Sequence, residues 1–140
     1  MQKHSRRRFL KSTGNAITAV SLLGSPLAAA ASPKADRLFI HHVYFWLNNH
    51  DSKEDRAKLL AGLQKLSKVK TIKSFHVGEP AATNRDVIDH SYSISWCLFF
   101  NNKADQDAYQ VDPIHLNFVK ECSSLWTRVV VYDAEDISFV

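Results

Sequence analysis

The order of hydrophobic and polar positions in this chain predicts a small domain of four strands and three helices. The clearest pattern covers residues 91–100, where bulky apolar residues alternate with mostly small ones. A period of two is typical of a strand with two different faces. The bulky face, expected to meet helices, comprises Tyr92, Ile94, Trp96, Leu98 and Phe100, and the other comprises Ser91, Ser93, Ser95, Cys97 and Phe99. The serine-lined face needs separate cover, either water or a second sheet.

Three more segments have the composition of strands. Residues 38–47 are rich in β-branched and aromatic side chains, which favours a strand buried on both faces. Residues 71–77 and 127–133 are shorter runs of the same kind. A polar loop is expected over residues 81–90.

Capping residues mark where three helices begin. Ser52 and Asp55 have the spacing of a capping box, and the helix that follows has an apolar stripe of leucines. Either Asn101 or Asn102 can cap a short helix over residues 103–110. Asp112-Pro113 is a favourable N-cap and first-turn pair for a third helix. The residues expected to face inward from these helices are Leu59, Leu60, Leu63, Leu66, Ile114, His115, Phe118 and Cys122.

The resulting order, β-α-β-β-α-α-β, predicts an α+β ferredoxin-like sandwich over residues 38–134, with a tail over 135–140. Its helices cover one face of a four-stranded antiparallel sheet. The serine-lined face then predicts a homodimer in which two sheets close face to face into a dimeric α/β barrel.

The first 31 residues have the pattern of a twin-arginine signal peptide. Arg6 and Arg7 lie in a basic run, and an apolar stretch over 16–27 precedes the small residues of a cleavage site. A membrane anchor is the alternative, but the apolar stretch is shorter than the roughly 20 residues that span a bilayer. We therefore expect recognition by the twin-arginine translocase, export to the periplasm or beyond, a short linker over 32–37, and no stable membrane association after cleavage.

Removal of the leader changes the net charge. The chain has 18 Lys and Arg against 14 Asp and Glu, a formal charge of +4. Five of the basic residues and none of the acidic ones lie in the leader, so 13 basic residues face 14 acidic ones in the remainder, a net charge of −1. Such a balance does not favour nucleic acid as a partner.

Three polar residues are candidates for chemistry. His42 is expected on the helix-facing side of the first strand, where it would meet Tyr109 and His115 in a pocket between sheet and helices. A histidine and a tyrosine there can act as an acid–base pair, with His115 and Tyr109 in the catalytic roles. The simpler interpretation is a hydrogen-bonded core histidine. The residues expected to line this ligand pocket are His42, Tyr44, Trp46, Tyr92, Ile94, Trp96 and Phe118.

The sequence gives little sign of a metal site. His41 and His42 are adjacent on a strand and point to opposite faces, so they cannot chelate one ion together. No zinc-binding spacing of cysteine and histidine appears. We expect no cofactor, with haem, held by His115 or His42, as the alternative. Cys97 and Cys122 are expected in different layers, which favours two free thiols over a disulfide.

The order and spacing of four segments resemble the stress-responsive dimeric α/β-barrel (Dabb) family. These segments are Ile40–Phe45, Phe75–Gly78, the alternating strand ending at Phe100, and Ala108–His115. The resemblance implies a ferredoxin-like monomer and a barrel-forming dimer, as expected above. In one plant member, olivetolic acid cyclase, a Tyr-x₅-His pair catalyses an aldol cyclisation without a cofactor. Its Tyr and His correspond to Tyr109 and His115, and its first-strand pocket histidine to His42.

That correspondence implies a general base at His115 and a carbonyl-binding hydroxyl at Tyr109. Two departures count against simple transfer: Asp112-Pro113 stands where the family often has His-Pro, and Ile94 stands where the cyclase has a further pocket histidine. Tyr44 and Trp46 also replace smaller aliphatic residues, so an alkyl tunnel would be shortened or blocked and the cyclase substrate is improbable. Four functions follow, in order of preference. They are an exported protein that binds a small hydrophobic or aromatic molecule, a cofactor-free cyclase, isomerase or lyase, a haem-binding protein, and a structural, stress-protective oligomer.

Overall fold

A computed structural model describes residues 37–137, and the elements in this range follow the expected order. They are β1 (Phe39–Leu47), α1 (Lys53–Leu66), β2 (Ser74–Gly78), β3 (Ile94–Phe100), α2 (Lys103–Gln110), α3 (Pro113–Cys122), the 3₁₀ turn η1 (Ser123–Leu125) and β4 (Trp126–Glu135). The expected signal peptide over 1–31, with Arg6 and Arg7, lies outside the described residues, as does the linker up to residue 36.

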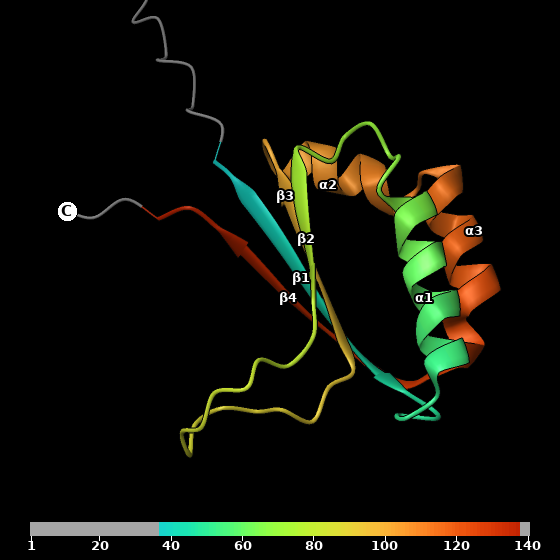
Figure 1. Ribbon diagram of the computed structural model, residues 1–140. Helices are drawn as coiled ribbons and strands as arrows, with labels where there is room; N and C mark the ends of the chain where they lie inside the picture. The colour runs from blue at the N-terminus through green and yellow to red at the C-terminus, as the bar shows by residue number, and fades with distance from the viewer. Residues whose placement is uncertain (1–36, 138–140) are drawn as a thin grey trace, which may run out of the picture. The chain divides into compact units, whose positions relative to one another are not determined.

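The four strands form one antiparallel sheet in the order β2-β3-β1-β4. The three α-helices lie on one side of this sheet, with α1 and α3 side by side (Figure 1). The α+β ferredoxin-like fold expected from the sequence is therefore confirmed.

All three helix caps form as the sequence predicts. The Ser52 hydroxyl accepts a hydrogen bond from the backbone N–H of Asp55 at 3.1 Å, which begins α1. Asn102, and not Asn101, caps α2. The Asp112 carboxylate accepts from the N–H of Ile114 at 2.8 Å at the start of α3. Each cap satisfies an N–H group that the first turn leaves without a helical partner.

The two faces of β1 are less alike than its composition suggested. Phe39, His41, Val43, Phe45 and Leu47 are buried against the helices, whereas the residues between them are only half-buried. The pairing register places Val43 beside Trp96 and His42 beside Cys97. The expectation of a strand buried on both faces is wrong for the chain alone, because the helices cover one face only.

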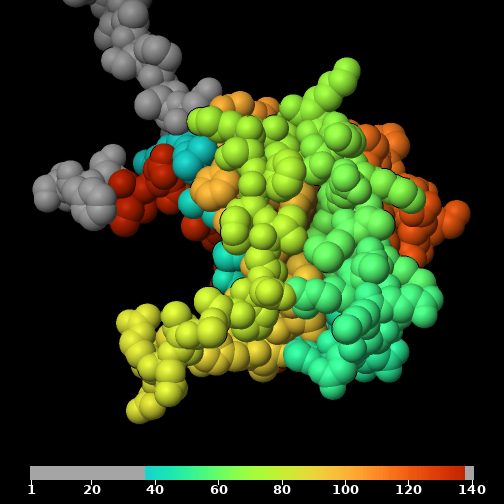
Figure 2. Space-filling view, in the orientation of Figure 1, coloured from blue at the N-terminus to red at the C-terminus, as the bar shows by residue number. Residues whose placement is uncertain are grey.

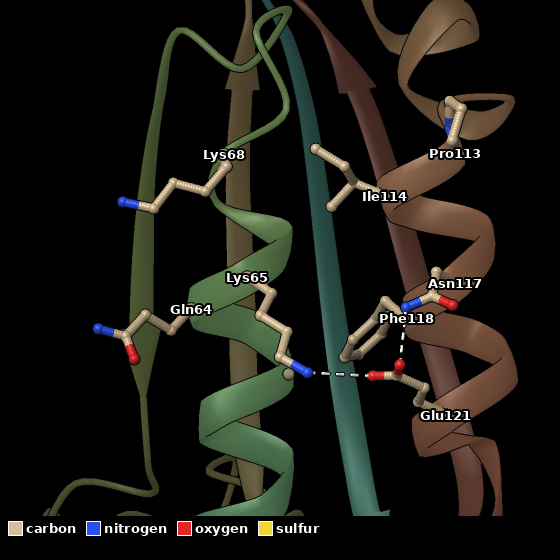
Figure 3. Close-up of a pocket in the computed structure, with 9 residues that line it drawn as sticks. Gln64, Lys65, Lys68, Pro113, Ile114, Asn117, Phe118 and Glu121 are labelled. Carbon is tan, nitrogen blue, oxygen red and sulfur yellow. Dashed lines mark hydrogen bonds and ion pairs between the residues drawn. The ribbon is translucent and has the colours of Figure 1, made fainter.

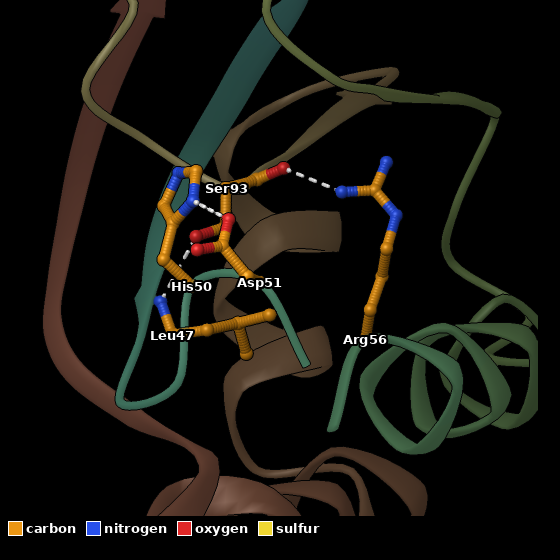
Figure 4. Close-up of polar contacts among 5 residues, drawn as sticks. All are labelled: Leu47, His50, Asp51, Arg56 and Ser93. Carbon is orange, nitrogen blue, oxygen red and sulfur yellow. Dashed lines mark hydrogen bonds and ion pairs between the residues drawn. The ribbon is translucent and has the colours of Figure 1, made fainter. Parts of the chain in front are cut away.

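The start of β3 also differs from the sequence expectation. The strand begins at Ile94 and not at residue 91, and the alternation does not extend to Tyr92, which packs edge-on against Tyr44 on the uncovered face. Ser93 is the reason, because its hydroxyl accepts from the N–H of Leu47 at 3.1 Å while its carbonyl accepts from Arg56 at 3.3 Å (Figure 4). The preceding segment, residues 79–92, projects from the domain (Figure 2).

Close contact between α1 and α3 depends on Gly62. A Cβ atom at this position would lie 2.6 Å from the Cys122 sulfur and 3.1 Å from the ring of Phe118, so a larger residue would push the helices apart. Cys122 is buried in this layer, and Cys97 is half-buried on the uncovered face of the sheet. Both are free thiols, separated by the sheet as the sequence predicts.

Candidate functional site

A cavity of about 350 Å³ lies between the helix-facing side of the sheet and the helices α2 and α3. Three titratable side chains line it: His41 from β1, Tyr109 from α2 and His115 from α3. The rest of the lining is almost entirely apolar and comprises Val43, Phe45, Leu66, Trp96, Phe118, Val119, Trp126, Val129 and Val131, with Gln110 and Ser123. A few polar groups in an apolar hollow are typical of small-molecule sites.

His41 is held by a carboxylate on the neighbouring strand. His41 and Asp133 are register partners on β1 and β4, and the imidazole Nδ1 lies 2.6 Å from an Asp133 carboxylate oxygen. Only 6% of His41 is exposed, whereas Asp133 reaches solvent. A carboxylate oxygen accepts in this contact, so Nδ1 is the donor and Nε2 is the ring nitrogen left free for a ligand. The pair is thus a histidine with an orienting acid.

His115 lies in the first turn of α3, six residues after Tyr109. Its Nδ1 donates to the backbone carbonyl of Gln110 at 3.1 Å, which again leaves Nε2 with its lone pair. Burial lowers the pKa of His115, and the hydrogen bond to Gln110 opposes that change in part. The imidazole is therefore neutral at pH 7.

The Tyr109 ring packs near the rings of both histidines. Its ring centroid is 4.6 Å from that of His115 and 5.9 Å from that of His41, and only 1% of the residue is exposed. Burial strongly raises the pKa of the hydroxyl. The indole N–H of Trp96 acts in the opposite direction from nearby, although it does not reach the geometry of a formed hydrogen bond. Tyr109 is therefore a protonated phenol that can donate to a ligand oxygen.

The arrangement combines one hydrogen-bond donor with two imidazoles whose Nε2 atoms are not used in these contacts. A carbonyl or hydroxyl oxygen beside Tyr109 can receive its hydrogen bond, and a neighbouring acidic proton can pass to an imidazole Nε2. Asp133 stabilises the imidazolium that would form on His41, as an orienting acid does in a hydrolase triad. His115 has no such carboxylate on its Nδ1.

The structure brings together only part of the expected pocket. Tyr109, His115, Trp96 and Phe118 line the cavity, and Ile94 is buried in the core without lining it. The other four expected residues, His42, Tyr44, Trp46 and Tyr92, lie on the uncovered face of the sheet. Their placement in this pocket is therefore wrong.

The histidine that sequence reasoning missed is His41. The sequence did contain a feature that pointed to His41. The residues that share its face of the strand are Phe39, Val43, Phe45 and Leu47, which are all strongly apolar. The set with His42 includes Tyr44 and Trp46, which carry polar atoms. The more apolar set is the one expected to face the helices.

A second, larger hollow of about 570 Å³ lies between α1 and α3 (Figure 3). In it, Lys65 forms an ion pair with Glu121 at 3.3 Å, and the Asn117 amide donates to the same carboxylate at 2.8 Å. No histidine, cysteine or tyrosine is among its lining residues. It lacks the acid–base side chains of the smaller cavity, which is therefore the better candidate site.

Within residues 37–137, no three His, Cys, Asp or Glu side chains are grouped in a way that would hold a metal ion. In the same range, none of the helices has the length and apolar character required to cross a membrane.

The chain matches a family model described as Stress responsive A/B Barrel Domain over residues 39–136. No curated protein matches it. Among solved structures, a Dabb family protein with a ferredoxin-like fold from Mesorhizobium loti is 17% identical, with 74% of this chain and 100% of that chain covered and a TM-score of 0.62. A hydroxynitrile lyase from Passiflora edulis is also 17% identical, with 76% and 98% covered and a TM-score of 0.61.

A dimeric ferredoxin-like protein of unknown function from Thermobifida fusca is 15% identical, with 71% and 92% covered and a TM-score of 0.59. At these identities the similarity to solved structures establishes the fold.

Proposed function

The chain belongs to the stress-responsive A/B barrel (Dabb) family, and on that premise we propose that it binds a small, mainly apolar molecule bearing a carbonyl or hydroxyl oxygen. The observation that carries the proposal is the convergence of His41, Tyr109 and His115 on one apolar cavity of about 350 Å³. Apolar walls favour a hydrophobic or aromatic body, and the three polar groups favour one oxygen on it.

Acetophenone, a small aromatic ketone, is a suitable first probe. We expect calorimetry to detect its binding to the full chain, and Tyr109→Phe to weaken binding about three- to tenfold because the hydroxyl donor is lost. Leu116→Ala, on an exposed position of α3 outside the cavity lining, is the control and should bind normally. Binding that is equal in the wild type and in Tyr109→Phe would remove the carbonyl-binding role of this hydroxyl.

A second candidate function is cofactor-free acid–base catalysis of the cyclase, isomerase or lyase type. The observation that favours it is the 2.6 Å contact between His41 and Asp133 beside Tyr109. In this proposal the Nε2 atom of His41 removes a proton from the carbon next to a carbonyl group. Tyr109 donates to the carbonyl oxygen as negative charge develops on it, and the Asp133 carboxylate stabilises the imidazolium.

Solvent deuterium exchange tests this step without knowledge of the natural substrate. The methyl protons of acetophenone should exchange faster in D₂O with the protein than without it, as followed by proton NMR. We expect His41→Asn to lower the protein-catalysed rate by roughly 10²–10⁴-fold, the usual contribution of a general base. His42→Asn is the matched control, because this adjacent residue lies on the opposite face of the sheet. Exchange that depends on neither histidine would contradict the mechanism.

The proposed molecule is an exported homodimer whose uncovered sheet faces meet. Support for the dimer comes from the dimeric relative in Thermobifida fusca and from the half-buried apolar and aromatic side chains of the uncovered face. Native mass spectrometry of the protein purified from the periplasm tests dimer formation, signal-peptide cleavage and ligand binding together. A cleaved dimer that carries extra mass would fit all three parts, and a clean monomer would contradict the barrel.

Export has its own test. Replacing Arg6 and Arg7 together with lysine should keep the protein in the cytoplasm, because the translocase reads the twin arginines. Normal appearance in the periplasm after this double substitution would contradict the twin-arginine route.

A further inference from the structure

Three buried side-chain polar atoms lack a hydrogen-bond partner within residues 37–137. They are the Nε2 atom of His42, the hydroxyl oxygen of Thr71 and the indole nitrogen of Trp96. Buried polar groups are satisfied with few exceptions, so each exception calls for an explanation. Of these three residues, Trp96 is the one that lines the cavity with Tyr109. Its indole N–H can only donate, so the group that it lacks is an acceptor.

The packing around Trp96 holds the indole where its neighbours supply no acceptor. The residue lies in β3 and is 1% exposed. Its partners across the sheet are Val43 on β1 and Val77 on β2, whose side chains have no polar atoms. The Phe75 ring packs against the indole with centroids 5.0 Å apart, which restricts its rotation. The N–H group is therefore kept away from water.

The Tyr109 hydroxyl is the acceptor within reach. It lies close enough to the indole N–H for that group to lower its pKa, against the strong increase that burial causes. The two groups do not have the geometry of a formed hydrogen bond. A phenol oxygen can accept one hydrogen bond while its own proton is donated to another group. A small movement of the Tyr109 side chain would thus satisfy the indole.

A ligand in the cavity cannot replace this acceptor directly. The indole nitrogen is buried, although other atoms of Trp96 line the cavity. The N–H can therefore act on a ligand only through a group that lies between the two. The Tyr109 hydroxyl is such a group, because Tyr109 also lines the cavity.

We propose that Trp96 is a positioning residue for Tyr109, and that its indole N–H donates to the Tyr109 hydroxyl when that hydroxyl donates to a ligand oxygen. The two hydrogen bonds form a chain from the indole through the phenol to the ligand, and bonds in such a chain strengthen one another. The chain favours a carbonyl oxygen, above all one that gains negative charge. This inference rests on the proposed function, because it requires Tyr109 to donate to a bound oxygen.

Replacing Trp96 with 3-benzothienylalanine tests the proposal, because this analogue keeps the shape of the indole and carries sulfur in place of the N–H. We expect the full chain with the analogue at position 96 to bind acetophenone about three- to tenfold less tightly in calorimetry, since one hydrogen bond of the chain is lost. Its urea midpoint without ligand should stay the same or rise, because the N–H is unpaired in that state. A purely structural role for the N–H predicts a lower midpoint and unchanged affinity.

Trp46 offers a matched control for this replacement. Its indole N–H donates to the Ser91 hydroxyl at 3.0 Å on the uncovered face of the sheet. The same analogue at position 46 should leave acetophenone binding unchanged. An equal loss of affinity from both positions would contradict a specific role for Trp96.

The indole N–H signals in a proton–nitrogen NMR spectrum report the new hydrogen bond. The chain has three tryptophans, and the signal of Trp96 is the one that the analogue at position 96 removes. Saturation with acetophenone should move this signal downfield, as expected when an N–H gains an acceptor, while that of Trp46 stays in place. In Tyr109→Phe saturated with acetophenone the downfield shift should be absent. A Trp96 signal that does not move, or moves equally in Tyr109→Phe, would overturn the proposal.

The outcomes separate this inference from the proposed function. If Tyr109→Phe weakens acetophenone binding and the analogue at position 96 does not, Tyr109 keeps its role and the role of Trp96 is wrong. If acetophenone binding does not depend on Tyr109, both are wrong.

Discussion

The two faces of the sheet carry similar residue types in different surroundings. His41 and His42 are adjacent in β1, yet His41 is paired with Asp133 in a helix-covered cavity and His42 stacks on Tyr44 at 4.3 Å on the uncovered face. The Nε2 atom of His42 is buried without a hydrogen-bond partner within the described part of the chain. The comparison shows that the layer above a strand, and not the residue type, decides what a histidine can do.

The largest difference between the faces should appear in stability. Leu98 and Phe99 are neighbours in β3, and Leu98 is fully buried under the helices whereas Phe99 is half-buried on the other face. We expect Leu98→Ala to lower the free energy of unfolding by about 2–5 kcal/mol, because it opens a cavity in the core. Phe99→Ala should cost less, although it removes more atoms. Urea denaturation at equal chain concentration measures both, and the reverse order would contradict the one-sided core.

A larger side chain on the helix-covered side should also lower the stability of the fold. Gly62→Ala brings a methyl group to within 2.6 Å of the Cys122 sulfur. We expect a net loss of about 1–2 kcal/mol, because overpacking exceeds the gain of up to about 1 kcal/mol in helix propensity. Adding Cys122→Ala to this variant removes the clashing sulfur. If the close approach of α1 and α3 is the cause, the double variant should lose less stability than the sum of the two single changes.

The reactivity of the two cysteine thiols measures how well each face of the sheet is covered. Burial raises the pKa of both Cys97 and Cys122, so both should react slowly with iodoacetamide at neutral pH. In the chain alone, Cys97 is the more exposed and should react faster. A sheet-to-sheet dimer would protect Cys97 as well, so its labelling rate should fall as chain concentration rises, while that of Cys122 stays low. Rapid labelling of Cys97 in a sample that native mass spectrometry shows to be dimeric would place the interface elsewhere.

The smallest expected effects concern pH. Burial lowers the pKa of His115 and, together with the nearby charges of His76 and then His41, that of His42. Between about pH 6.5 and each lowered value, the unfolded chain binds more protons than the folded one, so stability rises with pH and is lost as the pH falls. His115→Asn and His42→Asn should each flatten the slope of unfolding free energy between pH 5 and 7.

A further substitution separates the two histidines. His76→Asn removes the imidazole whose electrostatic interaction lowers the pKa of His42, and it should raise the pKa of His42 only, as measured by histidine NMR titration. An equal change in the pKa of His115 would contradict the inference that the sheet separates the two histidines.

Much of the fold could be predicted from local signals. The starts of all three α-helices agree with the expected ones because Ser52, Asn102 and Asp112 cap them through contacts within three residues. The ends of the strands were less predictable. Residues 71–73 and 91–93 have strand composition but lie outside β2 and β3. In these two segments, turns and side-chain contacts such as those of Ser93 replace the pairing of a strand.

The site was predicted in part. Tyr109 and His115 were identified because their spacing across the Asp112-Pro113 corner brings them together, and the ring distance of 4.6 Å agrees. His42 was chosen in place of His41 because alternation fixes which residues share a face but not which face the helices cover. Asp133 was not identified, since its contact with His41 joins residues 92 positions apart.

The sequence by itself determined the order of the elements, the helix caps and the two sets of side chains on each strand, because these depend on neighbours along the chain. Only the tertiary structure decided which set meets the helices, and with it the partners of His41 and the packing of His42, Tyr92 and Tyr132 around Tyr44. A strand carries the same period of two whichever way it faces, so the assignment of its faces depends on the register of the sheet and the layer that covers it.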